Sequence, residues 1–173
     1  MLPAITLLTT GGTIASLESP DGLVPAMHAA DILKACPELE RIAKVETRDV
    51  FSLDSSNIQP EEWQVLARAV LDAARGCQGI VITHGTDTMA YSASALSFML
   101  QGLNIPVVLT GSQLPLKHPL SDAPSNLREA FTVAAQAPPG VYVVFHHKVM
   151  YGTRAVKLRT LGFDAFDSIN APA

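Results

Sequence analysis

The chain has 173 residues, of which 48% are hydrophobic and 16% are charged, and its formal net charge is −4 at pH 7. This length predicts one globular domain with a substantial core and is too short for two domains of ordinary size. Because the acidic balance comes without any run of Lys or Arg, the sequence lacks the positive surface that phosphate backbones require, and we expect no nucleic-acid partner.

The cysteines and the N-terminus indicate a compartment. Cys36 and Cys77 form no CxxC pair and are too few for a disulfide framework, so we interpret them as buried free thiols. The first residues lack a basic segment followed by a long apolar one, and no stretch approaches about 18 consecutive apolar residues. We therefore expect a soluble, cytoplasmic protein with no membrane partner.

The first two predicted elements are a strand and a helix. Residues 4–8 form an apolar run that is typical of a strand buried on both faces. Residues 60–75 carry apolar residues at helical spacing, in one continuous stripe that ends with Leu71 and Ala74. Pro60 suits the first helical position, and Gly76 suits the end of the helix.

The remaining elements alternate in type. Apolar runs at 80–82, 105–109 and 141–145 predict three further strands, and helical patterns lie between them at 91–101 and 127–135. This alternation predicts an α/β fold, a three-layer domain with a largely parallel sheet flanked by helices.

The segment 149–157 is interpreted differently, as a hairpin with Gly152-Thr153 at its centre. Its glycine and threonine favour a turn between two short extended stretches.

Polar loops follow four apolar segments. They are residues 11–13, 54–57, 84–87 and 110–113, of which the second follows the apolar segment near Leu53. Because ligands in open α/β sheets bind beyond the carboxyl ends of the strands, we expect these four loops to meet on one rim.

Two of these loops are short threonine-bearing turns, at residues 10–15 and 84–88. A tight glycine turn lets the backbone approach a small ligand closely, and each turn would place a hydroxyl in a cleft. The carboxylate of Asp87 offers a partner for proton transfer or for an ammonium group. The combination indicates an enzyme.

Six segments in one order carry a resemblance to a known family. They read TGGTIA at 10–15, DSS at 54–56, ITHGTDTM at 82–89, PVVLTG at 106–111, DAPSNL at 122–127 and GTRAVK at 152–157. They resemble the bacterial-type L-asparaginases, with the related glutaminase-asparaginases and an amidotransferase subunit used in charging tRNA. The resemblance covers the whole chain and implies that residues 1–173 form one asparaginase N-terminal-like α/β domain.

The resemblance also implies a catalytic set. Thr13 matches the nucleophilic threonine of the first turn, and Thr86, Asp87 and Lys157 match a second polar triad. Thr13 would attack the side-chain amide of L-asparagine, and ammonia would leave. A water near the second triad would then resolve the acyl-enzyme to L-aspartate. No metal and no organic cofactor is expected. A neutral hydroxyl needs a base or a lowered pKa for this attack.

Further residues are implied to bind the substrate. Ser55 and Ser56 match the segment that holds the α-amino and α-carboxylate groups, and Asp87 would accept a charge-assisted hydrogen bond from the ammonium. The substrate-binding residues implied by the resemblance are Gly12, Ser55, Ser56, Gly85, Thr86 and Asp87.

Each of these assignments has a structural alternative. Thr13 could be a polar turn residue, and Lys157 could be a solvated lysine on an edge hairpin. Ser55 and Ser56 could be turn residues before a helix. Asp87 with its neighbour Thr88 could cap the following helix.

The histidines need a separate interpretation. His118, His146 and His147 lack any ligand spacing with Cys, Asp or Glu, so no metal site is expected. We interpret His84 as an oriented structural group beneath the turn that carries Thr86.

The chain departs from the family pattern at a mobile loop. Leu23 stands where family members carry a tyrosine thought to activate the nucleophile, although residues 17–27 still resemble a lid. Activation of Thr13 would then come from Lys157, from water or from another tyrosine such as Tyr151.

A second departure is length. Family members usually carry a smaller second domain, which is absent here, and residues 168–173 resemble the start of the linker to it. The chain would be a short form or an N-terminal domain. An uncovered apolar surface would drive self-association, so we expect a homo-oligomer.

Three alternatives to an asparaginase stay open. The chain could be a related amidase, either a glutaminase acting on L-glutamine or a tRNA-dependent amidotransferase-type domain. It could also be a catalytically impaired amino-acid-binding domain. A flavodoxin-like nucleotide binder rests on fold analogy alone.

Overall fold

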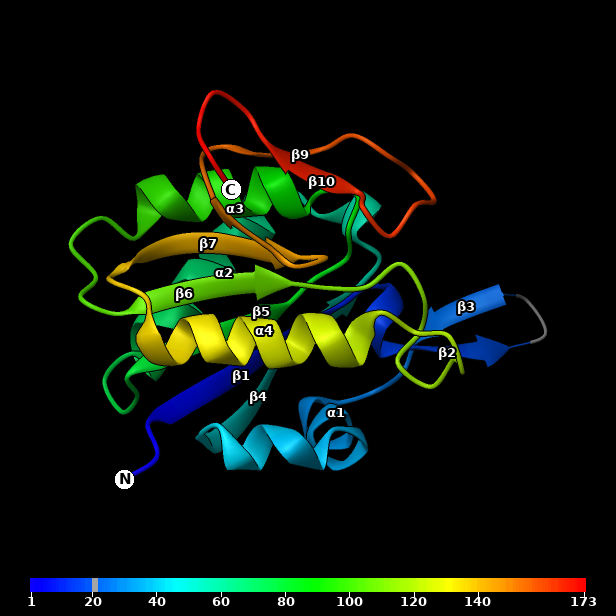
Figure 1. Cartoon of the computed structure of the whole chain (residues 1–173), viewed down its shortest axis with the longest axis horizontal. Coiled ribbons are helices and arrows are strands. Elements are labelled where there is room, and N and C mark those ends of the chain that lie inside the picture. Colours follow the sequence, from blue (N-terminus) through cyan, green and yellow to red (C-terminus); the bar gives the residue numbers. More distant parts are fainter. Residues whose placement is uncertain (20–21) are drawn as a thin grey trace.

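A computed structural model describes residues 1–19 and 22–173 of the chain. Its centre is a six-stranded sheet in the order β4-β1-β5-β6-β7-β8 (Figure 1). The first five of these strands are parallel to their neighbours, and β8 joins the edge in the antiparallel direction. Their bounds are β4 Lys44–Leu53, β1 Ala4–Gly11, β5 Gly79–Thr83, β6 Pro106–Thr110, β7 Gly140–Phe145 and β8 Lys148–Tyr151.

The four predicted strands are confirmed as β1, β5, β6 and β7. The sequence indicated only the end of β4, near Leu53. As an edge strand, β4 alternates exposed and half-buried residues, so it presents no continuous apolar run.

Helices cover both faces of the sheet, as the three-layer prediction requires. The helices α1 (Ala29–Ala35) and α4 (Ala123–Gln136) lie in front of the sheet in Figure 1, and α2 (Pro60–Ala73) and α3 (Met89–Met99) lie behind it. A short 3-10 helix, η2 (Pro37–Arg41), follows α1 on its face.

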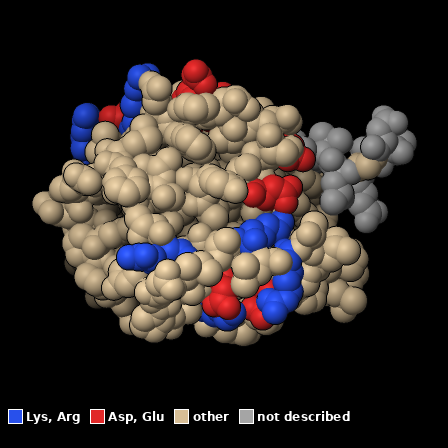
Figure 2. Space-filling model, turned by 90° about the horizontal axis from the view of Figure 1, so that it is seen from above, with Lys and Arg blue, Asp and Glu red and all other residues tan. Residues whose placement is uncertain are grey.

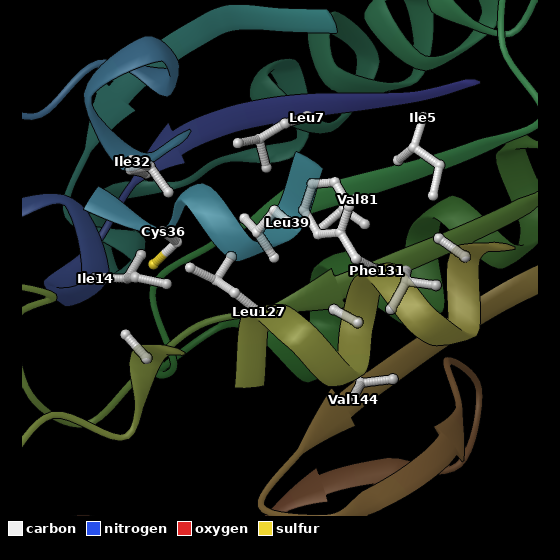
Figure 3. Packing of buried hydrophobic residues seen from close by; sticks show 14 of the residues in the cluster. Ile5, Leu7, Ile14, Ile32, Cys36, Leu39, Val81, Leu127, Phe131 and Val144 are labelled. Atoms are coloured by element: carbon white, nitrogen blue, oxygen red, sulfur yellow. The ribbon is translucent and has the colours of Figure 1, made fainter. Parts of the chain in front are cut away.

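The core is divided by the sheet into two apolar clusters. Ile80 and Ile82 pack with α2 and α3, whereas Val81 between them packs with α1 and α4. Figure 3 shows the second of these clusters, with Leu127 and Phe131 of α4 directed toward the strands. Burial on both faces explains why these strands consist of continuous apolar runs.

The predicted helices are confirmed with shifts at their ends. α2 begins at Pro60 and is preceded by a capping box between Gln59 and Glu62. It ends at Ala73, before Gly76, and Leu71 is 45% exposed rather than part of the buried stripe, where Ala73 packs instead. α3 and α4 begin two and four residues earlier than predicted, at Met89 and Ala123.

The prediction of one hairpin over residues 149–157 is wrong. β8 pairs with β7 across the His146-His147 turn, while β9 (Ala155–Lys157) pairs with β10 (Phe166–Ser168). A Cβ at Gly152 would lie only 2.8 Å from Ser97 Oγ. The chain therefore passes tightly against α3 at this glycine, and the two strands that flank it have different partners.

A small hairpin follows the first strand. It consists of β2 (Ser16–Ser19) and β3 (Gly22–Pro25) and projects from the body of the molecule at the right of Figure 1. The predicted lid, residues 17–27, includes Pro20 and Asp21, which lie outside the described residues. Of the helices that the structure describes, none is long and apolar enough to cross a membrane.

Candidate active site

A pocket opens where the carboxyl ends of four parallel strands meet. β1, β4, β5 and β6 end there, and the loops after the first three of them line a pocket of about 150 Å³. Its lining residues are Gly12, Thr13, Ser16, Asp54, Ser55, Gly85, Thr86 and Asp87. Six of the residues predicted from the sequence are thus brought together from segments far apart in the chain.

Two glycines allow these loops to pack against one another. Gly12 has a φ angle of +77°, and a Cβ at this position would collide with the backbone of Gly85. A Cβ at Gly85 would in turn lie 2.5 Å from Ser55 Oγ. The loops after β1, β5 and β4 therefore contact each other through positions where only glycine fits.

Thr13 is the first residue of the 3-10 helix η1 (Thr13–Ala15). The turn before it is fixed, because Gly12 N donates to Leu53 O over 3.0 Å and Ser16 Oγ donates to Gly12 O over 2.9 Å. Thr13 is half-buried and lines the pocket, and within the described part of the chain its hydroxyl has no hydrogen-bond partner. That hydroxyl is thus held at the pocket and available to a ligand.

Thr86, Asp87 and Lys157 form one hydrogen-bonded group. Lys157 Nζ, on β9, donates to Thr86 Oγ1 over 2.8 Å and to Asp87 Oδ1 over 2.7 Å. The Lys157 side chain is only 15% exposed, so the solvated-lysine alternative does not describe it. The ammonium group thus contacts two residues, Thr86 and Asp87, that line the pocket.

Ion pairs hold the β9–β10 segment that carries Lys157. Lys148 Nζ lies 2.8 Å from Asp164 Oδ1 and 3.7 Å from Asp167 Oδ1, and Arg159 Nη1 lies 3.2 Å from Asp164 Oδ2. These bonds lower the pKa of the Asp164 carboxyl and raise the pKa of Lys148. Figure 2 shows Lys and Arg beside Asp and Glu on the face seen from above.

The two predicted serines lie in different environments. Ser55 is 2% exposed and lines the pocket, and its carbonyl accepts a hydrogen bond of 2.8 Å from Thr88 Oγ1. Ser56 is exposed, and its backbone N and its Oγ both donate to Asp54 Oδ1, at 2.9 and 2.8 Å. These bonds lower the pKa of the Asp54 carboxyl. Asp54, not Ser56, lines the pocket.

Thr88 occupies the N-cap position of α3, as the capping alternative expected for this region. Its side chain, however, makes no cap hydrogen bond and donates to Ser55 O instead. Its hydroxyl therefore joins the loop after β4 to the loop after β5.

His84 is a structural group, in agreement with the sequence interpretation. It is fully buried, and its Nδ1 donates to Gly85 O over 2.7 Å. Burial lowers its pKa to about 4, so the ring is neutral at pH 7. It supports the turn before Thr86 without facing the pocket.

No tyrosine replacing the lid tyrosine is seen in the described part of the site. Tyr151 pairs with Tyr142 at the amino half of β7, and the two ring centroids lie 5.7 Å apart. This end of the sheet is opposite the carboxyl ends at the pocket, so the suggestion that Tyr151 activates Thr13 is wrong. Leu23 is on β3, and its side chain lies outside what the structure describes.

Three residues of this region were missed as site residues. Ser16 and Asp54 line the pocket, and Gln113 Oε1 lies 3.2 Å from Thr86 Oγ1. The position of Gln113 in the loop after β6, at the expected rim, was the signal that could have found it. Among the described residues, no group of three or more His, Cys, Asp and Glu could hold a metal ion.

Known proteins resemble this chain over most of its length. The family model described as "Asparaginase, N-terminal" matches residues 4–173. The chain is 55% identical, over 96% of its length, to an L-asparaginase of Thermococcus kodakarensis. It is 43% identical, over 98% of its length, to a glutamyl-tRNA(Gln) amidotransferase subunit of Methanosarcina mazei.

Solved structures show the same fold. The thermostable L-asparaginase from Thermococcus kodakarensis superposes with a TM-score of 0.91 over 98% of this chain, at 53% identity. L-asparaginase I from Vibrio cholerae superposes with a TM-score of 0.90 over 99% of it, at 37% identity. The chain spans about half the length of these relatives, 51% of the first curated sequence and 42% of the second.

Proposed function

Because this chain belongs to the asparaginase family, whose N-terminal domain it matches over residues 4–173, we propose that it hydrolyses L-asparagine to L-aspartate and ammonia. The observation that carries the proposal is the pocket itself. Thr13, with no hydrogen-bond partner among the described residues, lines the same pocket as Thr86 and Asp87, which Lys157 bonds. A nucleophile and a charged proton-transfer group on one small pocket are the parts that amide hydrolysis needs.

In the first step, Thr13 Oγ1 attacks the side-chain carbonyl carbon of the substrate. The C–N bond then breaks, the proton given up by the Thr13 hydroxyl passes to the leaving nitrogen, which departs as ammonia, and an ester to Thr13 remains. A backbone N–H of the glycine turn stabilises the oxyanion of the tetrahedral intermediate.

In the second step, a water attacks the ester carbon, the C–O bond to Thr13 breaks, the departing Thr13 oxygen takes a proton from the water, and L-aspartate leaves. Thr86 and Lys157, which are hydrogen-bonded to each other over 2.8 Å, orient this water. No step requires a metal or an organic cofactor.

We assign the orientation of the substrate to the carboxylates of Asp87 and Asp54 and to Ser55. Asp87 has a side chain that is 60% exposed, so it retains room to accept a hydrogen bond from the substrate ammonium beside its bond to Lys157. Asp54, whose pKa is lowered by Ser56, supplies a second negative charge on the pocket. Gly12, Gly85 and Ser55 form the wall against which a small amino acid fits.

The test is ammonia release from L-asparagine, with L-glutamine in parallel. We expect Thr13→Ala and Thr86→Ala each to lower the rate by a factor of about 10³ or more, since each removes a group that acts in the chemistry. Circular dichroism should be unchanged. A Thr13→Ala protein that keeps the parent rate would refute the assignment of the nucleophile.

A second candidate function is supported by the similarity to the glutamyl-tRNA(Gln) amidotransferase subunit. Turnover of L-glutamine at least equal to that of L-asparagine would favour such an amidase. Binding of L-aspartate in calorimetry without any product from either amide would instead indicate an amino-acid-binding domain. We further propose the cytoplasm as its location, which stays a prediction from the sequence.

A further inference from the structure

The side chain of Gln113 links the second triad to the loop between β9 and β10. Thr86 Oγ1 lies 3.2 Å from Gln113 Oε1, while Gln113 Nε2 donates to the carbonyl oxygens of Thr160 and Gly162, each over 3.0 Å. One amide thus contacts three groups that belong to two different loops. None of these contacts was used in the hydrolysis described above.

The two carbonyls determine which way the amide faces. A backbone carbonyl oxygen only accepts hydrogen bonds, so the NH₂ group of Gln113 must face Thr160 and Gly162. The amide oxygen must then face Thr86. The flip ambiguity that normally affects glutamine amides is therefore resolved here by chemistry.

This orientation determines the direction of the Thr86 hydroxyl. Gln113 Oε1 cannot donate, so the hydrogen of Thr86 Oγ1 points to it. The Lys157 ammonium donates to Thr86 Oγ1 from another side, over 2.8 Å, and occupies one lone pair. A hydroxyl oxygen has two lone pairs, so the second one remains for a group in the pocket.

We propose that Gln113 is a positioning residue that makes Thr86 a hydrogen-bond acceptor toward the pocket. In this arrangement Thr86 Oγ1 accepts a hydrogen bond from the water that attacks the acyl-enzyme and so orients this water toward the ester carbon. As the C–O bond to Thr13 breaks, the proton that the water loses passes to the departing Thr13 oxygen. Without Gln113, the hydroxyl can rotate and donate into the pocket, so that Thr86 occupies one lone pair of the water and no longer accepts a hydrogen bond from it. The inference rests on the proposed function, because it states which way the Thr86 hydroxyl points during the proposed hydrolysis.

The backbone of Gln113 is held independently of its side chain. Gln113 N and Leu114 N donate to the carboxylate of Asp122, over 3.0 and 3.1 Å. Asn126 Nδ2 donates to Asp122 Oδ2 over 3.1 Å and to Gly111 O over 2.9 Å. A substitution of the Gln113 side chain should therefore leave the loop after β6 in place.

The decisive variant is Gln113→Met, which keeps the length of the side chain and removes its acceptor and its donors. We expect kcat for L-asparagine to fall by a factor of about 10 to 100, which is part of the roughly 10²- to 10⁴-fold that positioned proton transfer contributes, because the variant removes only the orientation of Thr86. KM should stay within a factor of about two, since the substrate contacts are intact. Gln64→Met, on an exposed position of α2, is the matched control and should behave as the parent.

Gln113→Glu distinguishes the contact of Gln113 with Thr86 from its contacts with the loop between β9 and β10. It also tests the proposal if the methionine variant does not fold. A protonated carboxyl keeps an oxygen toward Thr86 and donates a hydrogen bond to the carbonyl of Thr160 or of Gly162. An ionised carboxylate has no hydrogen to donate, so it cannot bond to either carbonyl. The ratio of its kcat to that of the parent should therefore be highest at low pH. It should decrease as the pH rises through the pKa of the introduced carboxyl.

The outcomes separate the two proposals. If the parent chain releases no ammonia, the proposed function and this inference both fail. If the parent is active and Gln113→Met has an unchanged kcat, or a raised KM alone, only the role of Gln113 is overturned. A kcat for Gln113→Glu that is as low as that of Gln113→Met at low pH, where a carboxyl oxygen still accepts from Thr86, has the same meaning.

Discussion

At the scale of single residues, Gly85 shows how the pocket depends on the absence of a side chain. A Cβ there would lie 2.5 Å from Ser55 Oγ and 2.6 Å from Ser55 Cβ, which requires the loop after β4 to move. We expect Gly85→Ala to lower kcat/KM by a factor of about 10² or more, because misplacement of site residues by about 1 Å has costs of this size. Steady-state kinetics and thermal unfolding measure the two effects.

Gly76→Ala is the control for that substitution. No atom lies within 4 Å of a Cβ at Gly76, so this variant should keep both activity and stability. Equal kinetics for Gly85→Ala and Gly76→Ala would contradict the close contact of the two loops.

His84 predicts a pH dependence of stability. Its pKa falls from 6.5 to about 4 on folding because of burial, so the unfolded chain binds the proton at a higher pH than the folded protein does. The contribution of His84 to the free energy of unfolding is therefore fully present above pH 6.5. It decreases by about 3 kcal/mol as the pH falls to 4.

Urea unfolding between pH 4 and 7 measures this slope. His84→Asn keeps a donor for Gly85 O and removes the titrating ring, so its curve should be flatter than that of the parent. Parallel curves for the two proteins would show that His84 does not cause the dependence.

At the scale of elements, the turn between β7 and β8 is held in an unfavourable conformation. His146 and His147 have φ angles of +47° and +64°, which residues with a Cβ rarely adopt. Side chains of α4 compensate, since Asn126 Oδ1 accepts from His146 N and Glu129 Oε2 accepts from His147 N, each over 3.0 Å. The hairpin is therefore fixed by the helix beside it as well as by its own pairing.

Replacing the two histidines by Asn-Gly should stabilise the chain. These residues are preferred in two-residue hairpin turns with positive φ, and we expect a gain of about 0.5 to 1 kcal/mol in the free energy of unfolding. Thermal unfolding of the double variant measures it. A decrease would mean that the lost bond of 2.6 Å between His147 Nδ1 and Glu129 Oε1 outweighs the relief of the unfavourable backbone conformation of the turn.

At the scale of the whole molecule, α3 presents apolar residues to solvent as well as to the core. Tyr91 and Phe98 are each 66% exposed on its outer side, and Leu161 in the β9–β10 loop is 90% exposed. Such residues favour association when they are contiguous. The homo-oligomer expected from the sequence stays a prediction, and light scattering at micromolar concentration checks it. A monomeric mass would contradict it.

The sequence alone determined the fold class, the four central strands and the two threonine turns. These features are local. A continuous apolar run or a glycine turn is visible in the chain without knowledge of its neighbours, and the motifs at 10–15 and 82–89 connected them to a family. Thr13, Thr86, Asp87 and Lys157 could be named for the same reason.

Only the tertiary structure decided which polar residues reach the pocket. Ser55 and Ser56 are adjacent in the chain, yet one lines the pocket and the other bonds Asp54 at the surface. Gln113 contacts Thr86 and residues 160 and 162 through an amide whose role depends on their carbonyls. The exchange of partners at Gly152 depends on its contact with α3. Such contacts join segments tens of residues apart, so their geometry is set by packing and not by local sequence.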